Sequence, residues 1–256
     1  MPSEIDMYRK VLPLVGLNDP EHPTESEVLE TAFVVTDGVL VTCWHVIRKA
    51  IEKDWTVIAA WDRRGDGRFT RLDVTDIAQH PAGDDLATAR IDLPGAGWRI
   101  PARERVLDLG TNVVAMGYPL PDTRTDPDGG LTHLVSFRLL KGYLTHIPVI
   151  ERDDYPPVPS LELDMPAPLG LSGGPLLAAE ERNLLLGVVY GTNAVERIES
   201  FARIEPETGD RTPEVLEIMS FALAHHPHTL RSLRGPATGD CPLGVLMQER
   251  GEVVDP

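Results

Sequence analysis

The sequence predicts an all-β fold made of short strands. The chain of 256 residues contains 23 prolines and 22 glycines, a content that favours frequent turns over long helices. The clearest single signal is Asp37-Gly38, which stands between the β-compatible runs 31–35 and 39–42. Two such runs around an Asp-Gly pair are typical of a β-hairpin. Short runs of the same kind recur along the chain at a spacing that suits β-barrels or a β-sandwich.

The remaining elements are expected at definite places. Regular structure should begin near Leu29. The one convincing helix is predicted over 212–223, because Thr212 is a favourable N-cap and Pro213 suits the first helical position. The other strand candidates lie at 55–61, 69–77, 86–91, 112–116, 131–145, 160–164, 175–178, 184–190 and 197–204.

Composition and charge restrict the partners and the compartment. The net charge is -16 and no lysine- or arginine-rich run is present, so a nucleic acid partner is not expected. Residues 1–17 include Glu4 and Asp6 and lack a long apolar core, so neither a signal peptide nor a membrane anchor is expected. Cys43 and Cys241 are the only cysteines, which favours a reducing cytoplasm over an oxidising compartment.

A Gly-Leu-Ser-Gly-Gly-Pro stretch places the hydroxyl of Ser172 among glycines that let a substrate approach the backbone. His45 and the pair Asp84-Asp85 precede it. Amide hydrolysis needs a nucleophile, a base, an acid that orients the base, and donors for the oxyanion. Ser172 would be the nucleophile and His45 the base, with the backbone N–H groups of Gly170 and Ser172 as donors. The residues alone leave Asp84 and Asp85 open as the acid.

These motifs, in this order, resemble those of the trypsin-like serine peptidases with the chymotrypsin fold, in particular the bacterial intracellular type. The Thr-Cys-Trp-His run that ends at His45 resembles the family's histidine motif. The Asp-Leu-Ala run that begins at Asp85 resembles its aspartate motif, and the stretch around Ser172 its serine motif. The resemblance covers about 31–190 and selects Asp85 as the acid. It implies a serine endopeptidase that acts on a protein or peptide substrate through an acyl-enzyme, without a metal or other cofactor.

The same resemblance implies two six-stranded antiparallel β-barrels with a C-terminal helix, and a substrate cleft between the barrels. His45 and Asp85 would come from the first barrel and Ser172 from the second. The chain is accordingly divided into an N-terminal segment (1–28), a first barrel (29–105), a second barrel with the C-terminal helix (106–235) and a tail (236–256). The tail could be disordered, pack across the second barrel or occupy the cleft.

Two departures from the family pattern concern activation and specificity. Leu171 stands before the serine where the digestive-type enzymes have an aspartate, so activation by zymogen cleavage is not expected. Narrow specificity or a regulatory protein partner would then have to restrain the enzyme, which fits an effector of a bacterial defence or signalling system. No PDZ-like domain is expected after the second barrel.

Pro166 stands where trypsin-like enzymes place the acid at the base of the specificity pocket. This predicts a preference for an uncharged, small or medium apolar side chain before the scissile bond. The residues that the resemblance places at the substrate are Pro166, Ala167, Leu169, Tyr190 and Gly191.

Two other functions remain open. One is a catalytically latent binding module with a protease-like fold and a closed cleft. The other is an α/β-hydrolase-type esterase, in which Ser172 would be followed by Asp210 and one of His225, His226 and His228. The motif order and the lack of alternating strands and long helices argue against the esterase. The three histidines are interpreted as residues at a helix C-terminus, not as metal ligands, because adjacent histidines cannot all face one ion.

Overall fold

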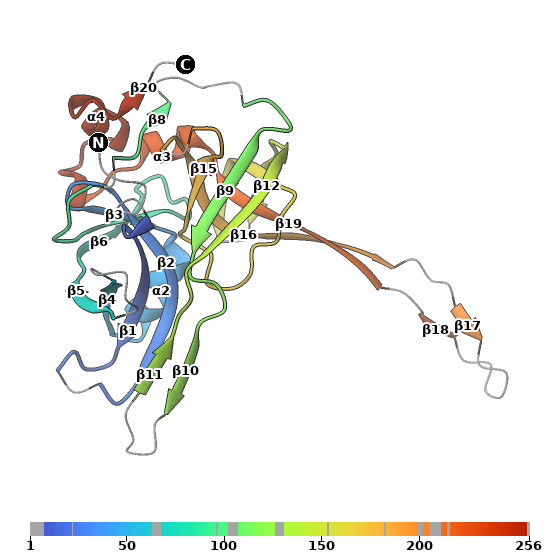
Figure 1. Cartoon of the computed structure of the whole chain (residues 1–256), viewed down its shortest axis with the longest axis horizontal. Coiled ribbons are helices and arrows are strands. Elements are labelled where there is room, and N and C mark those ends of the chain that lie inside the picture. Colours follow the sequence, from blue (N-terminus) through green and yellow to red (C-terminus); the bar gives the residue numbers. More distant parts are fainter. Residues whose placement is uncertain are drawn as a thin grey trace.

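The computed structural model describes residues 8–21, 23–62, 68–95, 97–101, 107–125, 131–152, 154–181, 183–198, 202–204, 211–213 and 216–254. Two curled antiparallel sheets lie side by side, and two short helices from the C-terminal part of the chain pack beside them (Figure 1). The predicted all-β architecture of two barrels is confirmed, but the described residues form seven strands in each sheet and not the six that were predicted.

The first sheet contains the predicted hairpin at Asp37-Gly38. Gly38 has a φ of +71°, a left-handed conformation that suits glycine, and the two strands beside it pair Phe33 with Val41. The strand order is β5-β4-β1-β2-β3-β7-β6. The strands are β1 (Val11–Leu17), β2 (Ser26–Thr36), β3 (Val39–Thr42), β4 (Thr56–Trp61), β5 (Thr70–Asp73), β6 (Thr75–Gln79) and β7 (Ala87–Arg90).

The second sheet closes on itself. Its order is β12-β9-β15-β16-β19-β14-β13, and β12 also pairs with β14, so six of its strands form a ring and β13 lies outside. The strands are β9 (Asn112–Gly117), β12 (Arg138–His146), β13 (Val149–Arg152), β14 (Tyr155–Leu163), β15 (Pro175–Ala178), β16 (Leu185–Ile198) and β19 (Leu216–His225).

Smaller elements connect and extend the sheets. Strands β16 and β19 run well beyond the ring as a two-stranded arm, and the pair β17–β18 follows farther out (Figure 1). The other elements are α2 (Trp44–Glu52), β8 (Ile100–Pro101), β10 (Asp122–Thr125), β11 (Leu131–Leu134), β17 (Ala202–Ile204), β18 (Arg211–Pro213), α3 (Pro227–Ser232), the 3₁₀ turn η1 (Pro236–Thr238), α4 (Leu243–Glu249) and β20 (Val253–Val254).

The helix predicted over 212–223 is wrong. Most of that segment is strand β19, whose pairing with β16 runs from His225 opposite Val188 to Leu216 opposite Ile198. Its buried end pairs with β14 as well. These long-range backbone hydrogen bonds outweigh the local N-cap and proline signals, because helix propensity is a weak preference that tertiary pairing overrides. The C-terminal helices are α3 and α4 instead.

Regular structure also begins earlier than Leu29. Strand β1 starts at Val11, is buried along its whole length and lies in the middle of the first sheet between β2 and β4. Its third residue is Pro13, which pairs with Thr31 of β2 but precedes the part of β1 that pairs with β4, beginning at Leu14.

The described part of the tail is folded. Leu243 and Met247 of α4 are fully buried in the same apolar cluster as the first-barrel residues, and Val253 of β20 pairs in parallel with Ile100 of β8. This segment therefore packs against the first barrel and β8. That cluster also takes in Tyr190 and other residues of the second sheet, so one continuous core joins the two barrels. Among the helices of the described ranges, none has the length and apolar character needed to span a membrane.

Candidate active site

His45 lies in the first turn of α2, directly after β3. The helix starts there because Val46, Ile47 and Ala50 form an apolar face that packs into the first barrel. His45 Nδ1 lies 2.7 Å from Asp85 Oδ2, and the His45 backbone N–H donates to Asp85 Oδ1 at 2.9 Å. One carboxylate thus holds both the ring and the start of the helix. Because Nδ1 carries the proton beside the carboxylate, Nε2 is left as the basic nitrogen.

Asp85 is 1% exposed and has, besides His45, a cationic neighbour that could not be foreseen from the sequence. Arg152, at the end of β13, donates from Nη1 to Asp85 Oδ2 at 2.6 Å. Its guanidinium lies 4.7 Å from the ring centre of Tyr155 and 5.0 Å from that of Tyr190. Burial alone would raise the pKa of Asp85, but the hydrogen bonds from His45 and the charge of Arg152 outweigh it and lower the pKa to about 2. The carboxylate is therefore ionised at neutral pH.

Asp84 faces a different histidine. Its Oδ2 lies 2.9 Å from His80 Nδ1, and His80 Nε2 lies 3.1 Å from the carbonyl oxygen of Ser232. Asp85, and not Asp84, therefore contacts His45. The resemblance to the trypsin-like family had selected the same acid.

Ser172 lies on the loop before β15, where the two barrels meet. Its carbonyl oxygen accepts a hydrogen bond from the Thr31 N–H at 3.1 Å, and the Gly173 N–H donates to Val189 at 2.8 Å. Gly173 has a φ of +83°, and a Cβ there would overlap the Thr31 carbonyl oxygen and Thr42 Oγ1. Only glycine fits this position. Within the described residues, Ser172 Oγ and His45 form no hydrogen bond with each other.

The predicted oxyanion donor at Ser172 already has an acceptor. The Ser172 N–H donates to Glu30 Oε2 at 3.1 Å. Glu30 is half-buried on β2, one residue before Thr31, whose hydroxyl donates to the Gly170 carbonyl oxygen at 2.6 Å. Sequence reasoning missed Glu30, because no local pattern indicates that a side chain of the first barrel reaches the serine loop of the second.

Comparison with known proteins places the chain in a family. The family model for the trypsin-like peptidase domain matches residues 30–188, more than half of the chain. The chain belongs to the trypsin-like peptidase family. The matched range contains His45, Asp85 and Ser172.

Solved trypsin-like proteases share the fold at low identity. The HtrA-type protease AlgW, solved with a decapeptide, is similar with a TM-score of 0.53 and 18% identity, over 89% of this chain and 65% of that chain. The Rv3671c protease of M. tuberculosis in its active form gives 0.53 and 17%, over 86% and 78%. Deg5 gives 0.52 and 17%, over 73% and 83%. No curated protein matches the sequence.

The residues expected at the substrate fall into two groups in this trypsin-like peptidase. Ala167 contacts the strand expected to bind the substrate, since its carbonyl oxygen accepts from Thr192 Oγ1 at 3.1 Å. Tyr190 is buried on that strand, and a Cβ added at Gly191 would meet no atom within 4 Å. The pairing of β15 with β16 ends at Val188, so the described part of β16 beyond Tyr190 pairs with β19 on one side and has no strand partner on the other.

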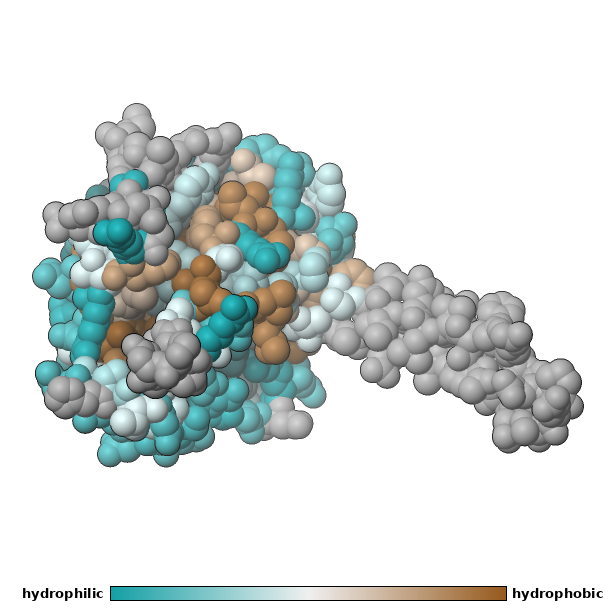
Figure 2. All heavy atoms as spheres, turned by 60° about the horizontal axis from the view of Figure 1, so that its bottom comes forward, coloured by the Kyte–Doolittle hydropathy of each residue, from teal (hydrophilic) through white to brown (hydrophobic). Residues whose placement is uncertain are grey.

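Leu169 and Pro166 lie on the exposed side of the loop that joins β14 to β15. Pro166 is exposed, and Leu169 is 77% exposed. The Leu169 carbonyl oxygen accepts from the N–H of Leu120, itself a largely exposed leucine. Exposed hydrophobic side chains also interrupt the hydrophilic surface on the face drawn in Figure 2. The peptidase thus presents apolar surface next to its serine loop.

The histidines at the C-terminal end of β19 and just after it are not at a helix C-terminus, so that interpretation is wrong. His225 ends strand β19, and His226 is the N-cap of α3, accepting from the His228 N–H at 3.2 Å. His225 is 1% exposed and lies 4.5 Å, ring centre to ring centre, from Tyr190. Burial lowers the pKa of His225 to about 4, so the ring is neutral.

His225, Cys43 and Asp85 bring three possible metal-ligating atoms within 4.8 Å of one another. The Cys43 thiol donates to the Val189 carbonyl oxygen at 3.3 Å, and burial raises its pKa well above the usual range. The Arg152 guanidinium already supplies a positive charge to Asp85. A protonated thiol and a neighbouring cation both disfavour a metal ion at this cluster.

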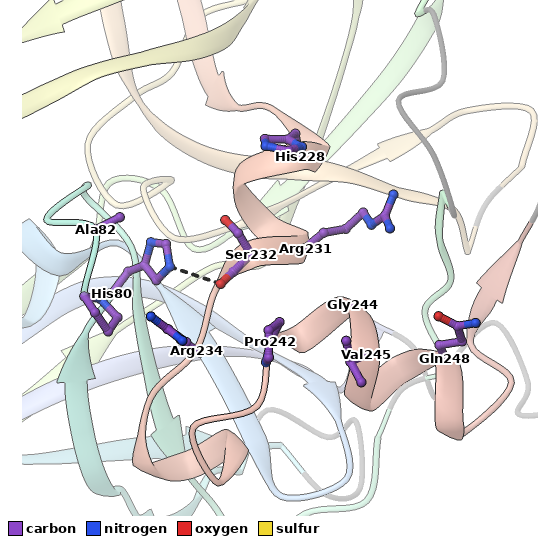
Figure 3. A pocket seen from close by; sticks show the side chains of 11 residues that line it. His80, Ala82, His228, Arg231, Ser232, Arg234, Pro242, Gly244, Val245 and Gln248 are labelled. Atoms are coloured by element: carbon purple, nitrogen blue, oxygen red, sulfur yellow. Dashed lines mark hydrogen bonds between the residues drawn. The ribbon is translucent and has the colours of Figure 1, made fainter.

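A large cavity of about 1000 Å³ lies elsewhere, between the turn after β6 and the C-terminal helices (Figure 3). His80 and Arg234 lie close together in it, and Arg231 and Gln248 lie farther along (Figure 3). The triad candidates do not line this cavity. It is linked to the active site through the His80–Asp84 contact, next to Asp85.

Proposed function

We propose that this trypsin-like peptidase is a cytoplasmic serine endopeptidase that cleaves peptide bonds through an acyl-enzyme on Ser172. The observation that carries the proposal is the double contact between His45 and one buried carboxylate, 2.7 Å from the ring and 2.9 Å from the backbone. Such a carboxylate orients the imidazole and stabilises the imidazolium that forms during catalysis. This chemistry requires no metal or organic cofactor.

In the first half of the reaction, His45 Nε2 takes the proton of Ser172 Oγ as that oxygen attacks the scissile carbonyl carbon. The N–H groups of Gly170 and Ser172 stabilise the oxyanion. When the C–N bond breaks, the proton on Nε2 passes to the leaving amine. Water then attacks the ester, gives its proton to Nε2, and Ser172 Oγ recovers that proton as the new carboxylic acid leaves.

The substrate is an extended protein or peptide segment. Because β15 pairs with β16 only as far as Val188, the free edge of β16 at Gly191 supports pairing with the peptide, the mode known as β-strand addition. The residue before the scissile bond would be an uncharged, small or medium apolar side chain near Ala167, because an acid is missing at Pro166.

Regulation would come from narrow specificity or from a protein partner, as in an effector of a bacterial defence or signalling system. Leu171 supports this view, because it is fully buried in the core of the second barrel. A leucine there offers no charge that a newly cleaved amino terminus could pair with.

The test is labelling of the purified chain with a fluorophosphonate probe, read by intact mass. We expect one probe on the native chain and none on the Ser172→Ala or His45→Ala variants. Ser232→Ala is the matched control, because Ser232 lies in α3 and its hydroxyl donates to Thr229; it should label like the native chain. A folded native chain that stays unlabelled would contradict the proposal.

One observation favours the alternative of a latent binding module, namely that the Ser172 N–H is occupied by Glu30. A binding module would remain unlabelled even when Glu30 is replaced by alanine. A restrained peptidase would label faster after that replacement. The Glu30→Ala variant therefore separates the two functions.

A further inference from the structure

Glu30 places a carboxylate where the developing oxyanion of a substrate has to bind. Its Oε2 accepts the Ser172 N–H at 3.1 Å, and that donor is one of the two which the proposed reaction requires. An anion and a transition state cannot use the same N–H at once. The side chain of Glu30 must therefore move before acylation.

The backbone beside Glu30 is firmly held, so the movement is confined to its side chain. The Thr31 N–H donates to the Ser172 carbonyl oxygen at 3.1 Å, and Thr31 Oγ1 both donates to Gly170 and accepts from the Tyr118 N–H at 2.9 Å. These contacts join β2 to the serine loop. Rotation of the Glu30 side chain can break its hydrogen bond without disturbing them.

The Glu30 carboxylate has no cationic partner among the described residues. The ion pairs recorded there involve other acids, such as Glu27 with Lys53 at 3.3 Å on the same strand. Buried carboxylates are normally paired with a cation or several donors, whereas this half-buried one accepts only the single backbone N–H among the described residues. A positive group brought by a substrate would supply the missing partner.

The position of Glu30 indicates which part of the substrate would carry that charge. The acyl half is expected along Tyr190 and Gly191 of β16, in the second barrel. Glu30 reaches Ser172 from β2, in the first barrel. The side chain therefore faces the leaving-group half of the peptide.

We infer that Glu30 determines specificity for a lysine or arginine directly after the scissile bond, and that this cation draws the carboxylate off the Ser172 N–H. The inference rests on the proposed endopeptidase activity. Binding of the correct leaving group would then free the Ser172 N–H for the oxyanion in the same step. A neutral residue at that position would leave the donor occupied and would slow acylation.

The test uses two quenched peptides that differ only after the scissile bond, with arginine in one and norleucine in the other. We expect the native chain to prefer the arginine peptide by at least about tenfold in kcat/KM. Glu30→Gln should reduce that preference to about twofold or less and cleave the norleucine peptide faster than the native chain does. Glu27→Gln is the matched control on the same strand and should keep the native preference. A Glu30→Gln variant that retains the preference for arginine would overturn the inference.

A second measurement needs no catalysis and so separates this inference from the proposed function. In the Ser172→Ala chain the backbone amide at 172 remains, and its ¹H–¹⁵N signal reports the hydrogen bond to Glu30. Saturating arginine peptide should move that signal toward its position in the Ser172→Ala, Glu30→Ala double variant, whereas norleucine peptide should leave it in place. An identical response to both peptides would contradict the inference even if the native chain is an active peptidase. A selective response would support it even if no cleavage is found.

Discussion

Arg152 shares with His45 a single oxygen atom of Asp85. The guanidinium Nη1 lies 2.6 Å from Oδ2, and the imidazole Nδ1 lies 2.7 Å from the same atom. The two donors come from different barrels, so the carboxylate joins α2 of the first barrel to β13 of the second. Its ionised state therefore depends in part on a contact across the boundary between the barrels, in addition to its hydrogen bonds with His45.

Removal of the Arg152 guanidinium should destabilise the fold. Arg152→Met keeps much of the aliphatic stem but leaves the buried carboxylate with one donor side chain fewer. Since Arg152 is 30% exposed, we expect a loss in the free energy of unfolding of about 1–3 kcal/mol, below that of a fully buried pair. Urea denaturation at pH 7 measures it.

The control for Arg152 is Arg48→Met, which breaks the Arg48–Asp154 pair at 3.2 Å, in which the acid is 61% exposed and not buried like Asp85. That loss should stay within about 0.5 kcal/mol, as for other surface pairs. Equal effects of the two substitutions would show that the Asp85 contact is no stronger than a surface ion pair.

As the pH falls, the first loss of stability is expected from the protonation of His225. Burial holds its pKa at about 4, below the ordinary value of 6.5, so the unfolded chain binds the proton at a higher pH than the folded chain. Stability is therefore expected to fall from about pH 6.5 to about pH 4, by about 3 kcal/mol from this residue. His225→Phe should remove that part of the pH dependence, measured by urea denaturation across the range. His228→Gln, at an exposed position, should leave the slope unchanged.

Protonation of Asp85 should destabilise the fold at a lower pH. Its pKa is about 2, below the ordinary value of 3.8, so its contribution to stability is complete above about pH 4 and is lost as the pH falls toward 2. The expected loss is about 2 kcal/mol. Asp85→Asn should flatten the decline of stability between pH 4 and pH 2 while lowering stability at pH 7. A decline in that window as steep as in the native chain would refute the assignment to Asp85.

Alanine substitutions at Gly173 and Gly191 are expected to have opposite effects on stability. Gly173→Ala forces a Cβ into the Thr31 carbonyl oxygen at a φ of +83°, and should cost more than about 3 kcal/mol or prevent folding. Gly191→Ala meets no atom within 4 Å and should change stability by less than about 1 kcal/mol. The added methyl would still intrude on the edge of β16 and slow peptide cleavage. Thermal denaturation and peptide hydrolysis distinguish the two effects.

Several features of the fold and of the site could be predicted from the sequence because they depend on neighbouring residues. The hairpin at Asp37-Gly38 follows from a short local pattern, and the resemblance of three ordered motifs predicted the two barrels. The motifs around His45, Asp85 and Ser172 could be found in the same way. The assignment of these three residues to one catalytic centre stays a prediction until the labelling experiment is done.

The sequence by itself determined the β-rich architecture and the residues proposed to carry the chemistry, since alternating patterns, turn residues and motifs act over short stretches of chain. Only the tertiary structure decided that 216–225 is a strand, because its partner β16 supplies hydrogen bonds that local propensity cannot anticipate. It also decided the partners of the triad candidates. Arg152, His225 and Glu30 reach the site from segments far apart in the chain, and their contacts with Asp85 and Ser172 depend on distances that exist only after the barrels have packed together.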